Sequence, residues 1–296
     1  MADVKRLHLV DGTFELFRAY YSKRPDHTTP DGRPFKAVAG LVSSMLTLLE
    51  DADEAVTHVA IAFDNPIRSF RNDLFPAYKS DEGMDPVLRG QFDAAEEAAA
   101  ALGLTVWRMD RWEADDALGT AAVRFADQVG QVRILSPDKD LGQVVRGSHI
   151  VLVDRIRQKV IDEAAVVEAR GVPPASIADF LGLTGDTADG IPGIAGFGAK
   201  SAATLLQAFG HIQQIPDDPS TWPPLRGAER LAKALAAERP LALLYARLAT
   251  LALDVPLPED LDALRYRGPT HPFASWCALC GLERYVARGQ RLAARG

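Results

Sequence analysis

Acidic residues gather in five short clusters along this chain, in positions where a metal site could form. Three of the clusters follow apolar runs that read as strands, at residues 6–10, 57–63 and 132–135. The carboxyl ends of parallel strands meet at one edge of a sheet, and α/β proteins bind ligands there. The nine acids are Asp11, Asp64, Glu113, Asp115, Asp116, Asp138, Asp140, Asp186 and Asp189.

So many carboxylates share one pocket only when cations neutralise them. Hard oxygen ligands favour Mg²⁺ or Mn²⁺. Two such ions are typical of phosphoryl transfer and phosphodiester hydrolysis. The pattern therefore predicts a metal-dependent enzyme that acts on phosphate esters.

The spacing within the clusters supports this interpretation. Glu113 and Asp116 are three apart on a predicted helix and share a face, while Asp115 reaches the same opening from the first turn. Asp138 and Asp140 flank Lys139 and project the same way in an extended segment. Each acid alone could instead be a helix cap, a turn residue or a partner of a helix dipole. The complete set is more specific than its members.

Two other phosphate-handling classes are excluded. Residues 9–13 resemble the first motif of haloacid-dehalogenase phosphatases, but that chemistry needs a nucleophilic Asp where Leu9 stands. No Walker-type phosphate loop occurs in the sequence.

A glycine-rich turn at residues 190–198 precedes a predicted helix. Glycines let the backbone approach a ligand closely, and a helix N-terminus favours anions. The turn is suited to holding a DNA phosphate without reading bases, although a glycine-stabilised helical hairpin would look the same. The candidate DNA-binding residues here are Gly193, Gly196, Gly198 and Lys200.

Basic and aromatic residues follow the first two acids. Cationic groups beside metal-bound carboxylates suit a scissile phosphate, and aromatic rings could stack a displaced base. The alternative is surface charge with ordinary core aromatics, which is favoured for Phe14 and Phe17. The candidates are Arg18 and Tyr20 after Asp11, and Arg68, Arg71, Tyr78 and Lys79 after Asp64.

Composition sets broad limits. The chain has 296 residues, 47% of them hydrophobic, and a net charge of −7 that becomes +2 when the nine clustered acids are set aside. This charge argues against a protein that coats DNA with a strongly basic surface, but not against a nuclease. No apolar stretch approaches a membrane span and no secretory signal is visible, so we expect a cytoplasmic, monomeric protein. Cys277 and Cys280 could be half of a zinc site, but a helix that buries both is favoured.

Strands and helices alternate in the first half, with strands expected at 6–10, 57–63, 105–107, 132–135, 149–153 and 158–161. Helices are expected at 36–51, 85–102 and 113–127. This alternation predicts an α/β fold with a mainly parallel sheet covered by helices. The second half reads as helical, at 163–170, 175–182, 198–209, 227–237 and 239–252. We therefore expect a core domain at 1–162 and a helical domain at 163–296.

At these motifs the chain resembles the 5′-nuclease family, which includes flap endonucleases and the N-terminal 5′→3′ exonuclease domain of bacterial DNA polymerase I. The matching stretches are residues 9–12, 62–64 with 69–71 and 77–79, 112–118, 134–141 and 183–200. The resemblance covers residues 5 to about 260. No polymerase domain follows, so the resemblance is to a stand-alone form.

The resemblance implies a PIN-like nuclease core and a helix-three-turn-helix module that together cut 5′ flaps and nicked or frayed DNA duplexes, and RNA primers, in replication and repair. It implies two or more Mg²⁺ or Mn²⁺ ions, with K⁺ at the carbonyls of the glycine turn. The first ion would take Asp11, Asp64, Glu113 and Asp115, with Asp116 in support. The second would take Asp138, Asp140, Asp186 and Asp189. Lys79 and Arg71 would hold the scissile phosphate.

Two departures from the family pattern stand out. A short basic and proline-rich stretch is replaced by residues 80–83, where Glu82 stands in the place of a frequent arginine; Arg89 could substitute. Gly190 replaces an asparagine. The acidic replacement keeps open a DNA-structure-binding relative with weak or lost catalysis. A PIN-type RNA nuclease is a third possibility, against which the glycine turn and helical module speak.

Overall fold

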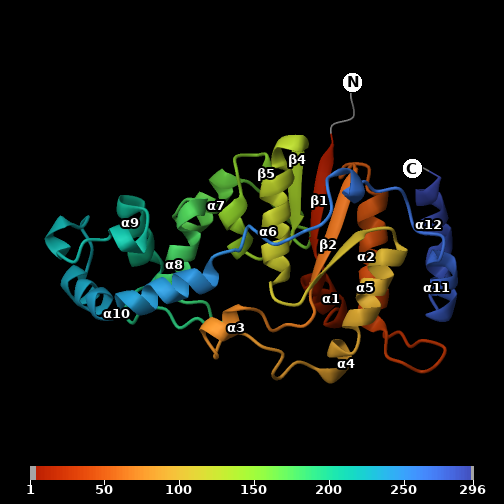
Figure 1. Ribbon diagram of the computed structural model, residues 1–296, viewed down its shortest axis with the longest axis horizontal. Coiled ribbons are helices and arrows are strands. Elements are labelled where there is room, and N and C mark those ends of the chain that lie inside the picture. Colours follow the sequence, from red (N-terminus) through yellow and green to blue (C-terminus); the bar gives the residue numbers. More distant parts are fainter. Residues whose placement is uncertain (1–4, 295–296) are drawn as a thin grey trace. The chain divides into compact units, whose positions relative to one another are not determined.

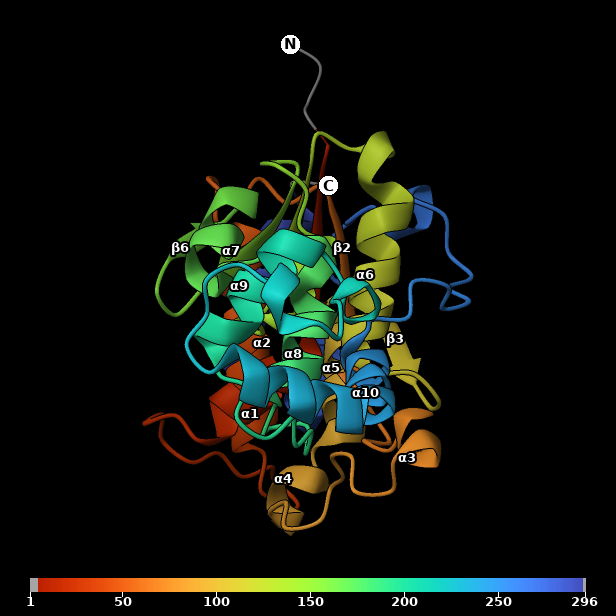
Figure 2. The same ribbon diagram turned by 90° about the vertical axis from the view of Figure 1, so that its left-hand side faces the viewer.

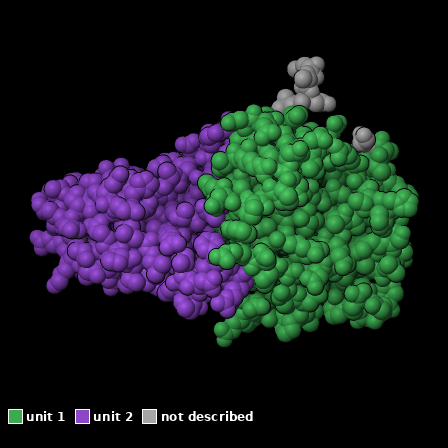
Figure 3. Space-filling view, in the orientation of Figure 1, with its two compact units in different colours: residues 1–67, 81–136, 253–296 green, residues 68–80, 137–252 purple. Residues whose placement is uncertain are grey.

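The computed structural model describes residues 5–294 (Figure 1). The contacts divide the chain into two units, which Figure 3 colours separately. Unit 1 contains residues 1–67, 81–136 and 253–296, and unit 2 contains residues 68–80 and 137–252. This division differs from the expected boundary at residue 162, because residues 137–162 group with the helical part and residues 253–296 return to the α/β part.

Four parallel strands form the centre of unit 1. They are β1 (Arg6–Asp11), β2 (His58–Asp64), β3 (Thr105–Met109) and β4 (Gln131–Leu135), in the order β3-β2-β1-β4. Residues 7–11 of β1 and 58–63 of β2 are buried, as expected for parallel strands that helices cover on both faces. The predicted strands of the first half, and with them the α/β fold class, are confirmed.

Helices cover this sheet on both faces (Figures 1 and 2). The connections from β1 to β2 and from β2 to β3 advance in one direction, so right-handed crossovers place α1 (Gly12–Tyr20) and α5 (Phe92–Ala101) on one face. The connection from β3 to β4 reverses direction and places α6 (Ala114–Phe125) on the other. The helix α2 (Lys36–Glu50) packs on α1 and α5.

The end of the chain completes unit 1. The helix α11 (Phe273–Leu279) packs on α5, and α12 (Val286–Ala293) packs on α2. Cys277 and Cys280 are buried here, as the favoured sequence interpretation expected. Burial raises the pKa of the Cys277 thiol to about 12, so this thiol stays protonated at neutral pH.

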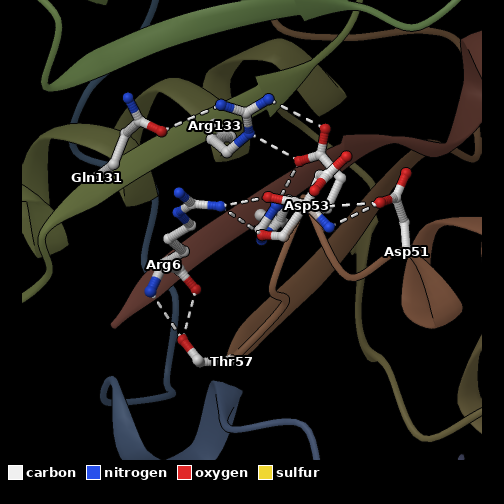
Figure 4. A network of polar contacts seen from close by, with 8 residues as sticks. Arg6, Asp51, Asp53, Thr57, Gln131 and Arg133 are labelled. Carbon is white, nitrogen blue, oxygen red and sulfur yellow. Dashed lines mark hydrogen bonds and ion pairs between the residues drawn. The ribbon is translucent and has the colours of Figure 1, made fainter. Parts of the chain in front are cut away.

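A partly buried polar network joins β1, β4 and the segment before β2 (Figure 4). The Glu54 carboxylate accepts hydrogen bonds from His8 Nε2 at 2.9 Å and from Arg133 at 2.7 and 3.0 Å. Burial lowers the pKa of His8, so the ring is neutral and donates its Nε2–H. Hydrogen bonds from His8 and then Arg133 lower the pKa of Glu54 to about 2. Arg6 donates to the Asp53 carbonyl and so fixes the same segment to β1.

Unit 2 combines a hairpin with helices. The strands β5 (Ile150–Asp154) and β6 (Lys159–Ile161) pair antiparallel and lead into α7 (Glu163–Arg170). The helix α8 (Ile177–Thr184) then packs on both α9 (Ala199–Phe209) and α10 (Ala228–Ala249). Short helical turns also occur at α3 (Arg71–Leu74) and at a 3-10 segment, Asp140–Val144.

The helices differ from the predictions in three places. The helix expected at 85–102 is split into α4 (Pro86–Arg89) and α5, because Gln91 turns the chain and its side chain bonds Ala37 N and Val87 O. The two helices expected at 227–237 and 239–252 are one, α10, with Pro240 inside it. Packing of α10 on α8 outweighs the cost of that proline. The aromatic segment after β1, to which no helix was assigned, is α1.

None of the helices among residues 5–294 is both long and apolar enough to cross a membrane.

Candidate active site

The first carboxylates of unit 1 sit where two adjacent strands end. Asp11 is the last residue of β1 and lies opposite Ala62 of β2, while Asp64 is the last residue of β2. Asp11 caps α1 by accepting from Phe14 N at 2.8 Å, and it also accepts from Ser136 Oγ at 2.9 Å. The last residues of two adjacent parallel strands thus place two carboxylates at one edge of the sheet.

The N-terminus of α6 brings the remaining unit 1 acids to this edge. The Asp64 carboxylate accepts from Ala114 N at 2.7 Å, which fixes the start of α6 against the end of β2. Glu113 and Asp116 form a capping box, in which each side chain accepts from the other residue's backbone N–H. Glu113 is 4% exposed and Asp116 is fully buried, whereas Asp115 is half-buried. Asp116 therefore has a structural task in the helix.

Unit 2 assembles the other four acids. Asp138 accepts from Asp140 N at 2.8 Å, and Asp140 accepts from Arg170 at 3.0 Å. Burial, followed by the charge of Asp138, raises the pKa of Asp140 to about 7. Asp186 and Asp189 add to this rise, while Arg170 opposes it. The four carboxylates of unit 2 therefore lie near enough for their charges to repel one another.

Lys79 belongs to the same region of unit 2. Its ammonium lies 3.5 Å from the Asp189 carboxylate, and its backbone N–H donates to the Asp189 carbonyl at 3.1 Å. Tyr78 donates to the Asp189 carboxylate at 3.2 Å. Gly190 makes this approach possible: its φ is +71°, and a Cβ there would lie 2.6 Å from the Ala77 carbonyl oxygen. Glycine in place of the family's asparagine thus lets the backbone at Gly190 pass close to the backbone of Ala77.

The glycine turn forms a small hairpin between α8 and α9. Asp186 and Ile191 exchange two backbone hydrogen bonds, at 2.9 and 2.7 Å. Gly193 has φ +72°, and a Cβ there would lie 2.4 Å from Gly185 N, so no other residue fits. Gly198 caps α9, and Lys200 is exposed on its first turn. The turn therefore presents an uncrowded helix N-terminus beside a lysine.

The structure also tests whether divalent cations suit these side chains. No three Asp, Glu, His or Cys side chains in the described part of the chain lie close enough together to bind one ion as they stand. The carboxylates are instead partnered by backbone N–H groups, by Ser136 or by cationic side chains. Their oxygen-only donor set and the mutual repulsion within unit 2 both fit Mg²⁺ or Mn²⁺, which would have to displace some of these partners.

Two family models match this chain. The family model described as "5'-3' exonuclease, N-terminal resolvase-like domain" matches residues 6–171, and "5'-3' exonuclease, C-terminal SAM fold" matches residues 172–272. The chain belongs to the 5′-3′ exonuclease family. The first model alone covers more than half of the chain.

Relatives of this 5′-3′ exonuclease family member include DNA polymerase I of Rhizobium leguminosarum, which is 37% identical over 87% of the chain and 26% of the polymerase. The chain thus spans about a quarter of that relative. The 5′-3′ exonuclease of Aquifex aeolicus is 29% identical over 72% of each chain. The fold is similar to that of bacteriophage T5 D15 flap endonuclease, solved as a pseudo-enzyme-product complex with DNA and metal ions (TM-score 0.63, 18% identity, covering 98% of this chain and 100% of that one).

Two of the residues predicted to contact DNA or its phosphate, Arg71 and Arg18, form hydrogen bonds with other parts of the protein. Arg71 is 2% exposed and donates to the backbone carbonyls of Leu248 and Thr250 at 2.7 and 2.8 Å. It joins α3 to the end of α10, so we do not retain it as a phosphate ligand. Arg18 donates to Glu15 and to Ser44 within unit 1.

Tyr20 and Arg68 are more accessible, whereas Tyr78 is only 4% exposed. Tyr20 donates to Asp85 at 2.6 Å, and this hydrogen bond raises the pKa of Tyr20 to about 12. Arg68 is 72% exposed, in a long ion pair with Asp73 at 3.5 Å. Both side chains could exchange these partners for a nucleic acid.

Sequence reasoning missed residues that support the acids. Thr13 Oγ1 accepts from Asp64 N at 2.8 Å, and Ser136 contacts Asp11. Ser136 directly follows β4, so its position after a strand was an available signal. Glu96 is 1% exposed and accepts from Asn65, the residue after Asp64, and from Arg108. Burial raises the pKa of Glu96, yet no local pattern marks this residue.

Proposed function

We propose that this chain is a divalent-metal-dependent 5′→3′ exonuclease and 5′-flap endonuclease that hydrolyses DNA phosphodiesters. Two observations support the proposal: Asp11 and Asp64 end adjacent strands, with Asp64 bonded to the start of α6, and the four acids of unit 2 lie close enough to repel one another. Membership in the 5′-3′ exonuclease family supports the same activity.

We assign one ion to unit 1, with Asp11, Asp64, Glu113 and Asp115 as ligands. We assign a second ion to unit 2, with Asp138, Asp140, Asp186 and Asp189. Mg²⁺ or Mn²⁺ bound there would activate the attacking water and neutralise charge on the phosphodiester. The metal ions in the T5 complex support a dependence on metal ions.

The side chains of unit 2 would then act on the phosphate directly. The Lys79 ammonium lies 3.5 Å from the Asp189 carboxylate, within the acidic region of unit 2, and would stabilise the charge that develops on a scissile phosphate there. The capping role of Asp116 would fix Glu113 for metal binding. Asp116 would thus act as a positioning residue.

We propose that the glycine turn binds the DNA backbone. Gly193 and Gly196 shape the turn with positive φ, Gly198 leaves the start of α9 open, and Lys200 adds a positive charge. A phosphate would bind the free N–H groups of this helix end. We propose K⁺ at the turn carbonyls, and 5′ flaps and nicked or frayed duplexes, including RNA primers in replication and repair, as substrates. The protein would act as a monomer.

A labelled 5′-flap duplex tests the activity. Wild-type protein should cleave it with Mn²⁺ or Mg²⁺ and not with a chelator. Asp11→Asn in unit 1 and Asp138→Asn in unit 2 should each lower turnover by at least about a hundredfold while the fold is retained. Asp53→Asn, outside both clusters, is the control. Unchanged turnover in either cluster variant would refute the metal assignment.

A second assay separates DNA holding from chemistry. Lys200→Ala should weaken duplex binding and lower its salt dependence by roughly one phosphate contact. Lys233→Ala, an exposed lysine on α10, is the matched control. An effect of Lys200→Ala on turnover alone would contradict the assigned role.

The alternative function is a DNA-structure-binding protein with weak or lost catalysis. The observation that favours it is the acidic segment at 80–83, where Glu82 replaces a frequent arginine. This alternative predicts flap binding without cleavage in Mn²⁺. Glu82→Arg would then increase flap affinity and leave turnover negligible.

A further inference from the structure

Unit 2 contains a pocket of about 360 Å³ that the proposed hydrolysis does not use. Much of its wall is apolar and comes from the β5–β6 hairpin and from α7 and α8. These apolar residues are Leu152, Ile161, Val166 and Phe180. The volume lies at the lower end of the range of small-molecule pockets, which is about 300–1,000 Å³. The pocket therefore suits one compact ligand.

Cationic side chains outnumber acids in the same wall. Lys139, Arg157 and Arg170 line the pocket together with one acid, Asp154. Asp154 accepts from Arg157 Nη1 at 2.7 Å and from the backbone N–H groups of Ile156 and Arg157, and the two backbone bonds remain when the Arg157 side chain turns away. Because Arg157 pairs with Asp154 and Arg170 pairs with Asp140, the surplus positive charge of this wall comes from Lys139, and it favours an anionic ligand.

A planar surface lies within the pocket wall. The Arg170 guanidinium lies over the Phe180 ring, with its carbon 5.7 Å from the ring centroid. The Arg170 Nε is buried and has no hydrogen-bond partner in the described structure, although Nη2 bonds Asp140. Aromatic rings and guanidinium planes are the surfaces on which nucleobases stack. A flat polar ring with a hydrogen-bond acceptor would satisfy this wall better than an alkyl chain would.

We propose that this pocket binds a single purine nucleoside 5′-monophosphate. The base would lie against the wall formed by Phe180 and Arg170, and the phosphate would pair with Lys139 and Arg157. Arg157 is 77% exposed and can turn from Asp154 toward a phosphate. This inference goes beyond the proposed function, although exonucleolytic hydrolysis would release ligands of this class.

Calorimetric titration of the full chain with dAMP in a chelator tests the proposal without any contribution from catalytic metal ions. Adenosine, inorganic phosphate and octanoate separate the contributions of base, phosphate and alkyl chain. We expect saturable one-to-one binding of dAMP. Each of the other three ligands should bind at least about tenfold more weakly.

Two variants of α7 provide a matched pair. Ala169 lines the pocket and is exposed, so Ala169→Trp would fill the space from a tolerant position. Val167 is 39% exposed on the same helix and does not line the pocket, so Val167→Trp adds the same bulk elsewhere. Ala169→Trp should weaken dAMP binding at least about tenfold, and Val167→Trp should leave it within about twofold.

Arg157→Ala is a third variant, at a side chain too exposed to be needed for folding. It should weaken dAMP binding about fivefold and leave adenosine binding unchanged. Absence of saturation up to about 10 mM dAMP would overturn the proposal. Equal affinities for dAMP and phosphate, for dAMP and octanoate, or for the two Trp variants would also overturn it. Because the titration uses no metal and no DNA, its failure is distinguishable from failure of the nuclease assay.

Discussion

Thr13 holds the end of β2 in place: its hydroxyl accepts a hydrogen bond from the backbone N–H of Asp64 at 2.8 Å. The hydroxyl belongs to the second residue of α1, immediately after β1, so this bond joins the ends of the two strands that supply Asp11 and Asp64. The positions of the two carboxylates are therefore coupled through a residue that is not itself acidic.

Thr13→Val should disturb this coupling. Valine keeps the shape of threonine but leaves the Asp64 N–H without this acceptor, which costs about 1–3 kcal/mol when the group is buried. We expect a loss of this size in urea unfolding and at least about tenfold lower cleavage. Thr13→Ser keeps the hydroxyl and is the control. Equal stability of the valine and serine variants would contradict the role of the bond.

The Glu54 network should make stability depend on acid pH. The pKa of Glu54 falls from 4.5 to about 2 on folding, so its contribution is complete above pH 4.5 and is lost as the pH falls toward 2. The contribution is on the order of 2–3 kcal/mol after allowance for partial exposure. Glu54→Gln should remove it.

Chemical denaturation between pH 2.5 and 7 checks this prediction. The gap between wild type and Glu54→Gln should be constant above pH 4.5 and narrow below it. Burial also lowers the pKa of His8, so the unfolded chain binds a proton below pH 6.5 that the buried ring does not bind. Stability of both proteins should therefore decline together below that pH. A gap that widens in acid would contradict the assignment.

Gly190→Ala should disrupt unit 2 locally. The residue has φ +71°, and a Cβ would lie 2.6 Å from the Ala77 carbonyl oxygen, so the Tyr78–Lys79 segment would have to move. We expect a stability loss of about 2 kcal/mol or more and reduced cleavage. Gly198→Ala is the matched control, because its φ is −125° and no atom lies within 4 Å of the added Cβ. Its melting temperature should stay near that of wild type.

Asp116→Ala distinguishes a capping residue from a residue that only binds metal. The fully buried carboxylate accepts from Glu113 N at 2.9 Å, so its loss should cost about 1–2 kcal/mol in a chelator. Asp115→Ala, on the same turn but half-buried, should cost much less. Similar stability of the two variants would show that the capping box contributes little.

The sequence predicted those parts of the site that a local pattern encodes. Asp11 and Asp64 were found because each ends an apolar strand, and parallel strands end at one edge. Glu113 was found because it stands where a helix begins. Each of these patterns involves only a few neighbouring residues, and the structure places all three residues at the ends of the expected strands and helix.

Contacts between distant segments were not readable in the same way. Arg71 looked like a phosphate ligand from its place after Asp64, yet it binds carbonyls 177 and 179 residues away. Pro240 looked like a helix break, but packing on α8 retains the helix through it. The support that Glu96 receives from Asn65 and Arg108 likewise depends on how β2, β3 and α5 come together.

The interleaved order of the two units has a consequence for synthesis of the protein. Residues 253–296 supply α11 and α12, which cover α5 and α2, and they follow the main segment of unit 2 in the chain. A chain that emerges from the ribosome N-terminus first can form β1 to β4, α2 and α5 early. The outer surfaces of α2 and α5 then stay exposed until α11 and α12 have been translated. The nascent intermediate would therefore expose apolar surface throughout translation of unit 2, during which chaperones could bind it.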